Sequence, residues 1–383
     1  MKLVQANMGL SDRDSEINFR DPYFTTQLIT YIGNKRRLLP FINNGIEKVK
    51  KALGKDKIIS FDGFAGSGVV SRLLKSHSDK LWSNDLEYYC EIINKCYLSN
   101  KSDVDLDWLK EKIKWLNENR LIGDEGIGFI EKNYAPKDDN NVQSGERVFY
   151  TNQNAKIIDN IKRLINQNIE KEKRYLLLAP LLIKASVHTN TSGVFKGFHK
   201  KDGVGHFGGR GENALFRIKR EISLDLPIFS EDNCQTTILR DDLNHLVKSG
   251  SLPEFDLAYY DPPYNQHPYG SNYFMLNIIA NGKEAKIQNG VSGIIEDWNR
   301  SNYNKREQAI VAMDDLIANT PAKYILISYN DEGIIPIQVF KDILNKYGTY
   351  ELMYEKYNTY RGSRNLKDRN IKVNELLWIL NKQ

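Results

Sequence analysis

The sequence of 383 residues is poor in cysteine and histidine and has no long apolar run. Its three cysteines, Cys90, Cys96 and Cys234, form neither a disulfide framework nor a zinc-binding pattern. We therefore expect reduced, buried thiols in an intracellular protein. The apolar stretch at residues 175–183 is shorter than the ~20 residues that a membrane helix needs. The N-terminal residues lack the continuous apolar segment of a secretory signal.

The charge balance is less restrictive than these absences. The chain carries 54 Lys and Arg residues against 49 Asp and Glu residues, which gives a net charge of +5. This mild excess permits a polyanionic partner without requiring one. With 40% hydrophobic and 27% charged residues, the composition is typical of a globular protein and not of a disordered one.

Residues 56–100 predict a strand, a turn, a helix, a second strand and a second helix. Residues 57–62 form a short apolar run that ends in an acid, and residues 63–68 form a glycine-rich turn. Helical spacing follows at residues 69–76, and a second strand is expected at residues 80–85. This order is the βαβ signature of a parallel sheet with helices on its faces.

The pattern changes between about residues 102 and 235, where helical periodicity and a polar, glycine-rich loop at 192–213 dominate. Strand-like runs then return at residues 256–260, 323–330, 349–357 and 375–381. The sequence therefore predicts an α/β domain that is interrupted by a largely helical insertion. The expected segments are a polar leader at 1–26, the two parts of the α/β domain at 27–101 and 236–383, and the insertion at 102–235.

The glycine turn directly follows Asp62. Gly63, Gly66 and Gly68 allow tight turning and close approach of a ligand. The turn lacks both the Gly-Lys-Ser/Thr ending of a P-loop and the third glycine of the dinucleotide fingerprint. A plain strand–helix turn is the alternative. Because Asp85 ends the next strand, two acids are expected at one sheet edge, which favours a nucleoside ligand.

A second chemical motif, Asp261-Pro262-Pro263-Tyr264, follows an apolar strand. Each proline fixes its own φ and biases the preceding residue toward extended geometry, so the acid and the tyrosine are held in defined directions. The carboxylate and a backbone carbonyl can accept both hydrogens of an exocyclic amino group while the tyrosine stacks on the ring. A proline-rich turn with merely packed tyrosines is the alternative. Its place on the same predicted sheet as the glycine turn favours a nucleobase site.

Together these motifs resemble the D12 (α) group of S-adenosylmethionine-dependent DNA adenine-N6 methyltransferases. The resemblance covers roughly residues 27 to 381 and lies in the order of four motifs. These are residues 30–42, the glycine turn, the "LRDD" segment at 239–242 and the DPPY motif after a long insertion. The resemblance implies a Rossmann-like sheet, S-adenosylmethionine as cofactor, and an insertion that recognises the target sequence. It also implies monomeric action on double-stranded DNA in a prokaryotic or phage-encoded cytoplasmic protein, with a cognate restriction endonuclease as a further partner.

The resemblance also assigns roles by position. The implied cofactor contacts are Tyr31, Lys35, Asp62, Gly63, Phe64, Gly66, Gly68, Asp85 and Asp241. The implied catalytic residues are Asp261, Pro262 and Tyr264. Asp242 is an alternative to Asp241 as the contact to the cofactor adenine. Asn34 departs from the family, where many members carry glycine; asparagine accepts a left-handed backbone more readily than most residues.

The implied reaction is a direct methyl transfer to N6 of an adenine that is flipped out of the duplex. Asp261 and the Pro262 carbonyl would aim the N6 lone pair at the sulfonium methyl, with no metal ion and no covalent intermediate. Two basic loops, at 195–212 and 360–372, are candidate phosphate readers, with a solvated face as the alternative. The candidate DNA contacts in them are Arg210, Arg361 and Arg364.

Three other functions stay open at this point. A cytosine-N4 methyltransferase would use nearly the same pocket, although such enzymes more often carry serine at position 261. An RNA or protein methyltransferase is disfavoured by the long insertion and the basic loops. A catalytically silent DNA-binding regulator with the same fold is disfavoured by the intact DPPY motif.

Overall fold

The computed structural model describes residues 3–5, 17–122, 126–209, 211–281, 285–358 and 372–383. The three arginines predicted to contact DNA, Arg210, Arg361 and Arg364, lie outside the described residues. Nearly all of the second basic loop lies outside them as well.

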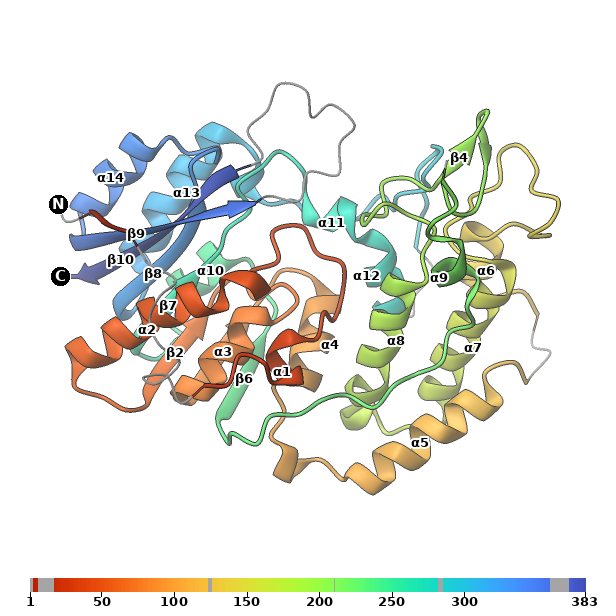
Figure 1. Ribbon diagram of the computed structural model, residues 1–383, viewed down its shortest axis with the longest axis horizontal. Coiled ribbons are helices and arrows are strands. Elements are labelled where there is room, and N and C mark those ends of the chain that lie inside the picture. The colour runs from red at the N-terminus through yellow and green to blue at the C-terminus, as the bar shows by residue number, and fades with distance from the viewer. Residues whose placement is uncertain (1–2, 6–16, 123–125, 210, 282–284, 359–371) are drawn as a thin grey trace.

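An eight-stranded sheet forms the centre of the α/β part (Figure 1). In spatial order its strands are β1 (Leu3–Gln5), β9 (Gly348–Asn358), β10 (Lys372–Lys382), β8 (Ala322–Asn330), β7 (Phe255–Tyr260), β2 (Ile58–Asp62), β3 (Ser78–Asn84) and β6 (Gln235–Leu239). Neighbouring strands are parallel except where β10 pairs antiparallel with β8 and β9. The predicted Rossmann-like α/β fold is confirmed.

Helices cover both faces of this sheet. One face packs against α1 (Pro22–Thr25), α2 (Leu39–Leu53) and α3 (Val69–His77), and the other against α10 (Leu243–Lys248), α13 (Arg306–Asn319) and α14 (Ile337–Asn345). Because both faces are covered, every residue of the central strand β7 is buried. Its sequence is accordingly a nearly continuous apolar run instead of an alternating one.

The direction in which the chain adds strands reverses between β2 and β7. From β2 the chain proceeds to β3 and β6 on one side, then returns to β7 in the centre and continues to β8 on the other side. Open α/β sheets bind ligands at such a switch point, outside the carboxyl ends of the strands. Asp62 ends β2 and Asp261 directly follows β7, so both acids lie at this point.

Parts of the N-terminal 26 residues belong to the fold. Strand β1 pairs in parallel with β9 at the sheet edge. Asp21 caps α1 by accepting a hydrogen bond from the Tyr23 backbone N–H at 2.7 Å. Tyr23 and Phe24 are buried in the same apolar cluster as α3. The buried side chains of Tyr23 and Phe24 fill space beside the sheet, although they lie within the segment 1–26 that the sequence analysis predicts to be a polar leader.

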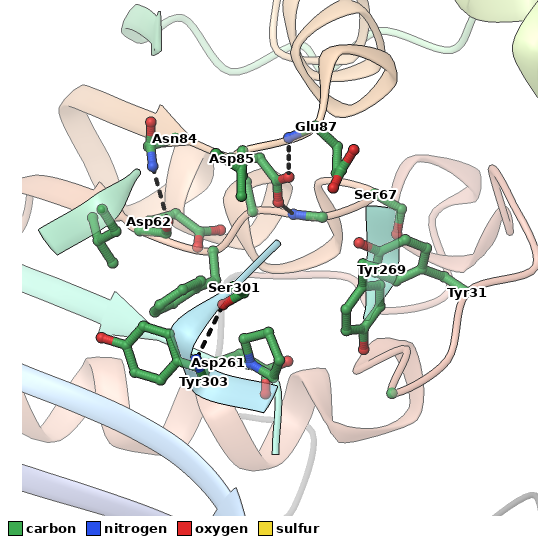
Figure 2. A pocket seen from close by; sticks show the side chains of 18 of the residues that line it. Tyr31, Asp62, Ser67, Asn84, Asp85, Glu87, Asp261, Tyr269, Ser301 and Tyr303 are labelled. Atoms are coloured by element: carbon green, nitrogen blue, oxygen red, sulfur yellow. Dashed lines mark hydrogen bonds between the residues drawn. The ribbon is translucent and has the colours of Figure 1, made fainter. Parts of the chain in front are cut away.

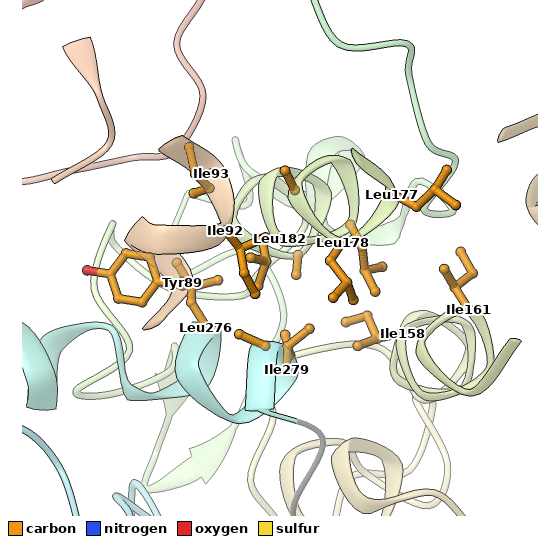
Figure 3. Packing of buried hydrophobic residues seen from close by; sticks show 14 of the residues in the cluster. Tyr89, Ile92, Ile93, Ile158, Ile161, Leu177, Leu178, Leu182, Leu276 and Ile279 are labelled. Carbon is orange, nitrogen blue, oxygen red and sulfur yellow. The ribbon is translucent and has the colours of Figure 1, made fainter. Parts of the chain in front are cut away.

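A second, mainly helical body adjoins the sheet. It contains α5 (Leu106–Asn119), α6 (Phe129–Tyr134), α7 (Asn152–Asn168), α8 (Tyr175–Val187), α9 (Leu215–Lys219) and a short hairpin of β4 (Lys200–Lys201) and β5 (Val204–Gly205). Helix α8 is apolar on most of its surface and lies at the centre of this body. Figure 3 shows its Leu178 and Leu182 among side chains of α7 and of two helices from the α/β part.

Those two helices are α4 (Tyr88–Tyr97), which follows Asp85, and α12 (Phe274–Asn281), which follows the DPPY motif and the short helix α11 (Tyr269–Asn272). Both contribute to the same apolar cluster as α8 (Figure 3). The helical body therefore packs against the helix that follows Asp85 and the helix that follows the DPPY motif.

Candidate active site

A pocket lies at the switch point, where β2, β3 and β7 end (Figure 2). It brings together most of the predicted site residues from distant parts of the sequence. Those that line it are Tyr31, Lys35, Asp62, Gly63, Phe64, Gly66, Asp85, Asp241 and Asp261. Gly68, Pro262 and Tyr264 adjoin this set in the chain but are not among the lining residues.

Asp85 is held by the backbone of the glycine turn. Its carboxylate accepts hydrogen bonds from the N–H groups of Gly66 at 2.8 Å and of Glu87 at 2.9 Å (Figure 2). The Ala65 N–H also donates to the Asn84 carbonyl at 2.9 Å. The turn after β2 and the end of β3 thus fix each other's position.

The glycines of this turn are required by close contacts. A Cβ added at Gly63 would lie 2.6 Å from the Tyr260 ring, and one at Gly66 would lie 2.8 Å from the Tyr31 ring. Gly66 and Gly68 have φ values of +52° and +77°, which side-chain-bearing residues rarely adopt. The turn therefore packs against the Tyr260 and Tyr31 rings as backbone alone, and a side chain at either position would displace them.

Asp62 is almost fully buried at the end of β2. Its Oδ2 accepts a hydrogen bond from the Ser71 hydroxyl at 2.6 Å. Its Oδ1 is buried and has no hydrogen-bond partner within the part of the chain that the structure describes. Burial raises the pKa of Asp62 to about 7, although the Ser71 hydrogen bond opposes this rise. A buried acceptor without a partner beside a pocket is suited to a ligand donor.

Tyrosines form one side of the pocket. The Tyr31 ring is stacked on that of Tyr273, with centroids 4.9 Å apart. It also lies beside the Tyr269 ring, at 4.9 Å between centroids (Figure 2). Tyr273 is fully buried and accepts a hydrogen bond from the Ile32 N–H at 2.8 Å, and the Tyr269 hydroxyl donates to the Ile32 carbonyl at 2.9 Å. The loop after the DPPY motif thereby holds the segment around Tyr31.

Lys35 connects the DPPY motif with the last strand. Its Nζ lies 3.2 Å from Asp261 Oδ1, forms a second ion pair with Glu375 of β10, and lies 5.2 Å from the centre of the Tyr264 ring. Lys35 and Glu375 are both nearly inaccessible. Burial alone would lower the pKa of Lys35, but the carboxylates of Asp261 and Glu375 outweigh it and hold that pKa well above its ordinary value. The lysine is therefore charged.

Asp241 and Asp242 both line the pocket and both contact His245 of α10, Asp241 at the imidazole ring (3.2 Å) and Asp242 at the backbone N–H. The Asp242 side chain caps α10 by accepting from the His245 N–H at 3.0 Å. Asp241 accepts from the Asp242 N–H at 2.8 Å, and its own N–H donates to the Asn84 side chain at 3.0 Å. The cap commits Asp242 to the helix, whereas Asp241 is tied to the end of β3.

Several lining residues were not predicted. Glu87 is buried, accepts from the side chains of Asn277 at 2.5 Å and Asn299 at 3.1 Å, and has a pKa raised to about 7 by burial. Tyr303 packs edge-on against Phe64, at 5.2 Å between centroids. Other unpredicted lining residues are Asn84, Asn299, Ser301 and Asn304. Asn84 and Glu87 flank the predicted Asp85, so the end of that strand was a local signal for them, whereas Asn299, Ser301, Tyr303 and Asn304 come from a segment far along the chain from either motif.

Two kinds of feature are absent from the described part of the chain. Its residues include no group of three or more His, Cys, Asp or Glu side chains that could hold a metal ion. None of its helices combines the length and the apolar character needed to cross a membrane. Cys90, Cys96 and Cys234 are buried and unpaired, as the sequence predicts.

Comparison with known proteins places this geometry in context. The sequence model of the D12 class N6 adenine-specific DNA methyltransferase family matches residues 31–343. The chain is 29% identical over 364 residues to type II methyltransferase M.NlaIII of Neisseria lactamica, covering 92% of this chain and 99% of that protein. It is 31% identical over 368 residues to modification methylase StsI of Streptococcus sanguinis, covering 92% of this chain and 52% of that longer protein.

A viral protein is similar as well. Type II methyltransferase M.CviAII of Paramecium bursaria Chlorella virus 1 is 29% identical over 349 residues, which cover 87% of this chain and 93% of that protein. Among solved structures, a class I S-adenosylmethionine-dependent methyltransferase from Listeria monocytogenes aligns with 93% of this chain and 63% of its own. That alignment has a TM-score of 0.34 and 9% identity.

Proposed function

The chain belongs to the D12 class of N6 adenine-specific DNA methyltransferases, and we propose that its pocket acts on an adenine turned out of duplex DNA. The protein is an enzyme that methylates adenine in DNA with S-adenosylmethionine as cofactor. The proposal depends on one observation: the glycine turn after β2 and Asp261 after β7 line the same pocket. A base stacked in a duplex cannot reach such a pocket, so the target has to be flipped out.

The lining residues fit the cofactor. Bound S-adenosylmethionine would supply an electrophilic methyl group on its sulfonium sulfur. Gly63 and Gly66 allow close approach of the backbone, and the unpartnered Oδ1 of Asp62 can accept a hydrogen bond from the amino acid end. Asp85 would accept from the ribose hydroxyls. We assign the adenine contact to Asp241, because the side chain of Asp242 caps a helix.

The target base would be held from the other side of the pocket. The Asp261 carboxylate lines the pocket beside the Lys35 ammonium, which lies 3.2 Å from Oδ1, and would accept a hydrogen bond from the N6 amino group. The Pro262 carbonyl would accept the second N6 hydrogen, and Tyr264 would stack on the base. Both acceptors orient the nitrogen lone pair toward the methyl group, so catalysis comes from positioning and from stabilising the developing positive charge.

The helical body would read the DNA sequence. Its β4–β5 hairpin and α9 lie in the same upper part of the molecule as α11, which follows the DPPY motif (Figure 1). The exposed cations of this region are Lys196, Lys200, Lys201, Lys219 and Arg220. Such side chains would contact phosphates and give binding that weakens as salt is raised. We propose residues 102–235 as the target-recognition part and retain Arg210, Arg361 and Arg364 as candidate contacts.

The biological setting is inferred from the relatives. Two of them are named type II methyltransferases and one a modification methylase. We therefore propose that the enzyme marks specific sites, that a restriction endonuclease of the same specificity accompanies it, and that it acts as a monomer in the cytoplasm.

Expression in a host that lacks adenine methylation tests the reaction. Sequencing of modified bases should find N6-methyladenine at one recurring sequence, and the Asp261→Ala variant should leave that sequence unmodified. Modified cytosine in place of adenine would refute the choice of base. Specific DNA binding by purified protein without any modified base would instead support a catalytically silent regulator.

A further inference from the structure

Lys35 is the only described cation that forms an ion pair with Asp261, and it shares its ammonium with a second buried acid. That acid is Glu375, which lies 4% exposed in β10 and beyond the residues that the family model matches. Glu375 does not line the pocket. Burying a carboxylate costs several kcal/mol of desolvation free energy, which is roughly offset only when the charge is paired. A buried acid at this position, outside the pocket, therefore suggests a role in holding Lys35.

Glu375 is fixed by the backbone far more firmly than Lys35. It lies opposite Asn330 of β8 and Glu355 of β9, so its strand is paired on both sides. Lys35 belongs to the segment between α1 and α2 and extends a flexible four-carbon side chain. The strand residue therefore defines where the ammonium is held.

The charges of the three groups do not cancel. One ammonium faces two carboxylates, so the cluster carries a net negative charge when both acids are ionised. If Asp261 were the sole partner of Lys35, the ammonium would form its ion pair with this carboxylate alone. The ammonium would then compete more strongly with the N6 hydrogens that the Asp261 carboxylate is proposed to accept. With Glu375 present, the ammonium is divided between two acceptors. The surplus negative charge also stabilises the positive charge that develops on N6 during methyl transfer.

We propose that Glu375 is a positioning residue for methyl transfer, acting through Lys35 to keep the Asp261 carboxylate oriented and available to the target amino group. This inference rests on the proposed role of Asp261. It assigns Glu375 no contact with the substrate or the cofactor. Removing its charge should therefore slow the transfer step without weakening the binding of either.

The test is the Glu375→Gln variant, which keeps the shape of the side chain and removes its charge. With saturating DNA we expect kcat to fall roughly 10- to 100-fold, as for a displaced catalytic group, while KM for S-adenosylmethionine stays within about twofold. The matched control is Glu351→Gln on the neighbouring strand β9, where Glu351 pairs with Lys48 at the surface. This control should retain the parent kcat.

A kcat for Glu375→Gln within about twofold of the parent would overturn the inference. If that variant does not fold, Glu375→Asp retains the charge but withdraws it by one methylene, and an unchanged kcat there would overturn it equally. The Lys35→Met variant tests whether Glu375 acts through Lys35. Adding Glu375→Gln to Lys35→Met should not lower kcat further. A further, multiplicative decrease in kcat would refute action through Lys35. An inactive parent enzyme would refute the proposed reaction instead.

Discussion

Asp85 and Asp261 both follow strands of the central sheet and line one pocket, yet different contacts hold them. Asp85 accepts two backbone N–H groups, whereas Asp261 faces an ammonium that Glu375 also contacts. Backbone donors fix a carboxylate without adding a charge, which suits a binding residue. Side-chain ion pairs leave a surplus charge beside the reacting atoms, which suits a residue that acts in the transition state.

The largest expected effect is that of Asp261→Asn. The amide nitrogen would face the N6 hydrogens with donors of its own and would remove the charge that stabilises the developing cation. We expect the single-turnover rate of methyl transfer to fall by about 10³-fold or more. Calorimetric binding of S-adenosylmethionine should remain within a few-fold of the parent. Equal losses of rate and cofactor affinity would mean that the two acids do not differ in role.

Asp85→Asn should instead weaken cofactor binding and leave the rate of methyl transfer nearly unchanged. The variant would lose the charged hydrogen bonds that we propose between Asp85 and the cofactor ribose, worth about 1.5–3 kcal/mol, so KM for S-adenosylmethionine should rise about 10- to 100-fold. The rate at saturating cofactor should change much less. Asp79→Asn is the matched control, because Asp79 is an exposed acid at the other end of β3. A lowered kcat at saturation with an unchanged KM would contradict the binding role.

Gly66→Ala tests the turn that supports Asp85. Gly66 has a left-handed backbone, and a Cβ there would lie 2.8 Å from the Tyr31 ring. Gly54 at the end of α2 also has a left-handed backbone, but nothing lies within 4 Å of an added Cβ. Both variants carry the backbone strain of about 1–2 kcal/mol. Only Gly66→Ala should also weaken cofactor binding, by about tenfold, as titration calorimetry would measure. Equal cofactor binding by both variants would show that the contact with Tyr31 is unimportant.

The features that the sequence predicts best depend on short stretches of chain. The strand, glycine turn and helix around Asp62 are encoded within a few neighbouring residues, and so is the stiff extension that places Asp261. Their meeting at one pocket follows from the general behaviour of parallel sheets. The ordered motifs then identify the family.

The features that the sequence does not reveal depend on long-range pairing. Glu375 reaches Lys35 only because β10 inserts antiparallel between β8 and β9, and no local signal indicates this register. Likewise, Tyr303 reaches Phe64 only through tertiary packing. The N-terminal residues are polar on average, which concealed the burial of Tyr23 and Phe24.

Asp62, which lines the pocket near Asp85, allows a direct test of how burial affects a carboxylate in the cofactor-binding part of the pocket. Burial raises the pKa of Asp62 to about 7, whereas the unfolded chain has a value of about 4. Between these values the folded protein holds a proton that the unfolded chain has lost. Protonated Asp62 therefore contributes stability that is fully present below about pH 4 and is lost as the pH rises through about 7, where the folded protein also loses this proton.

Asp62→Asn removes that dependence. In cofactor-free protein, denaturant unfolding should show that the variant gains roughly 2–3 kcal/mol relative to the parent between pH 5 and pH 8, because the parent loses about 1.4 kcal/mol per pH unit up to its folded pKa. Asp56→Asn, an exposed acid before β2, should track the parent at both values. A gain at pH 5 that disappears at pH 8 would reverse the sign and show that the buried carboxylate is stabilised by its surroundings. In that case the protein alone would already stabilise the ionised Asp62, without the hydrogen bond that we propose from the amino acid end of the cofactor.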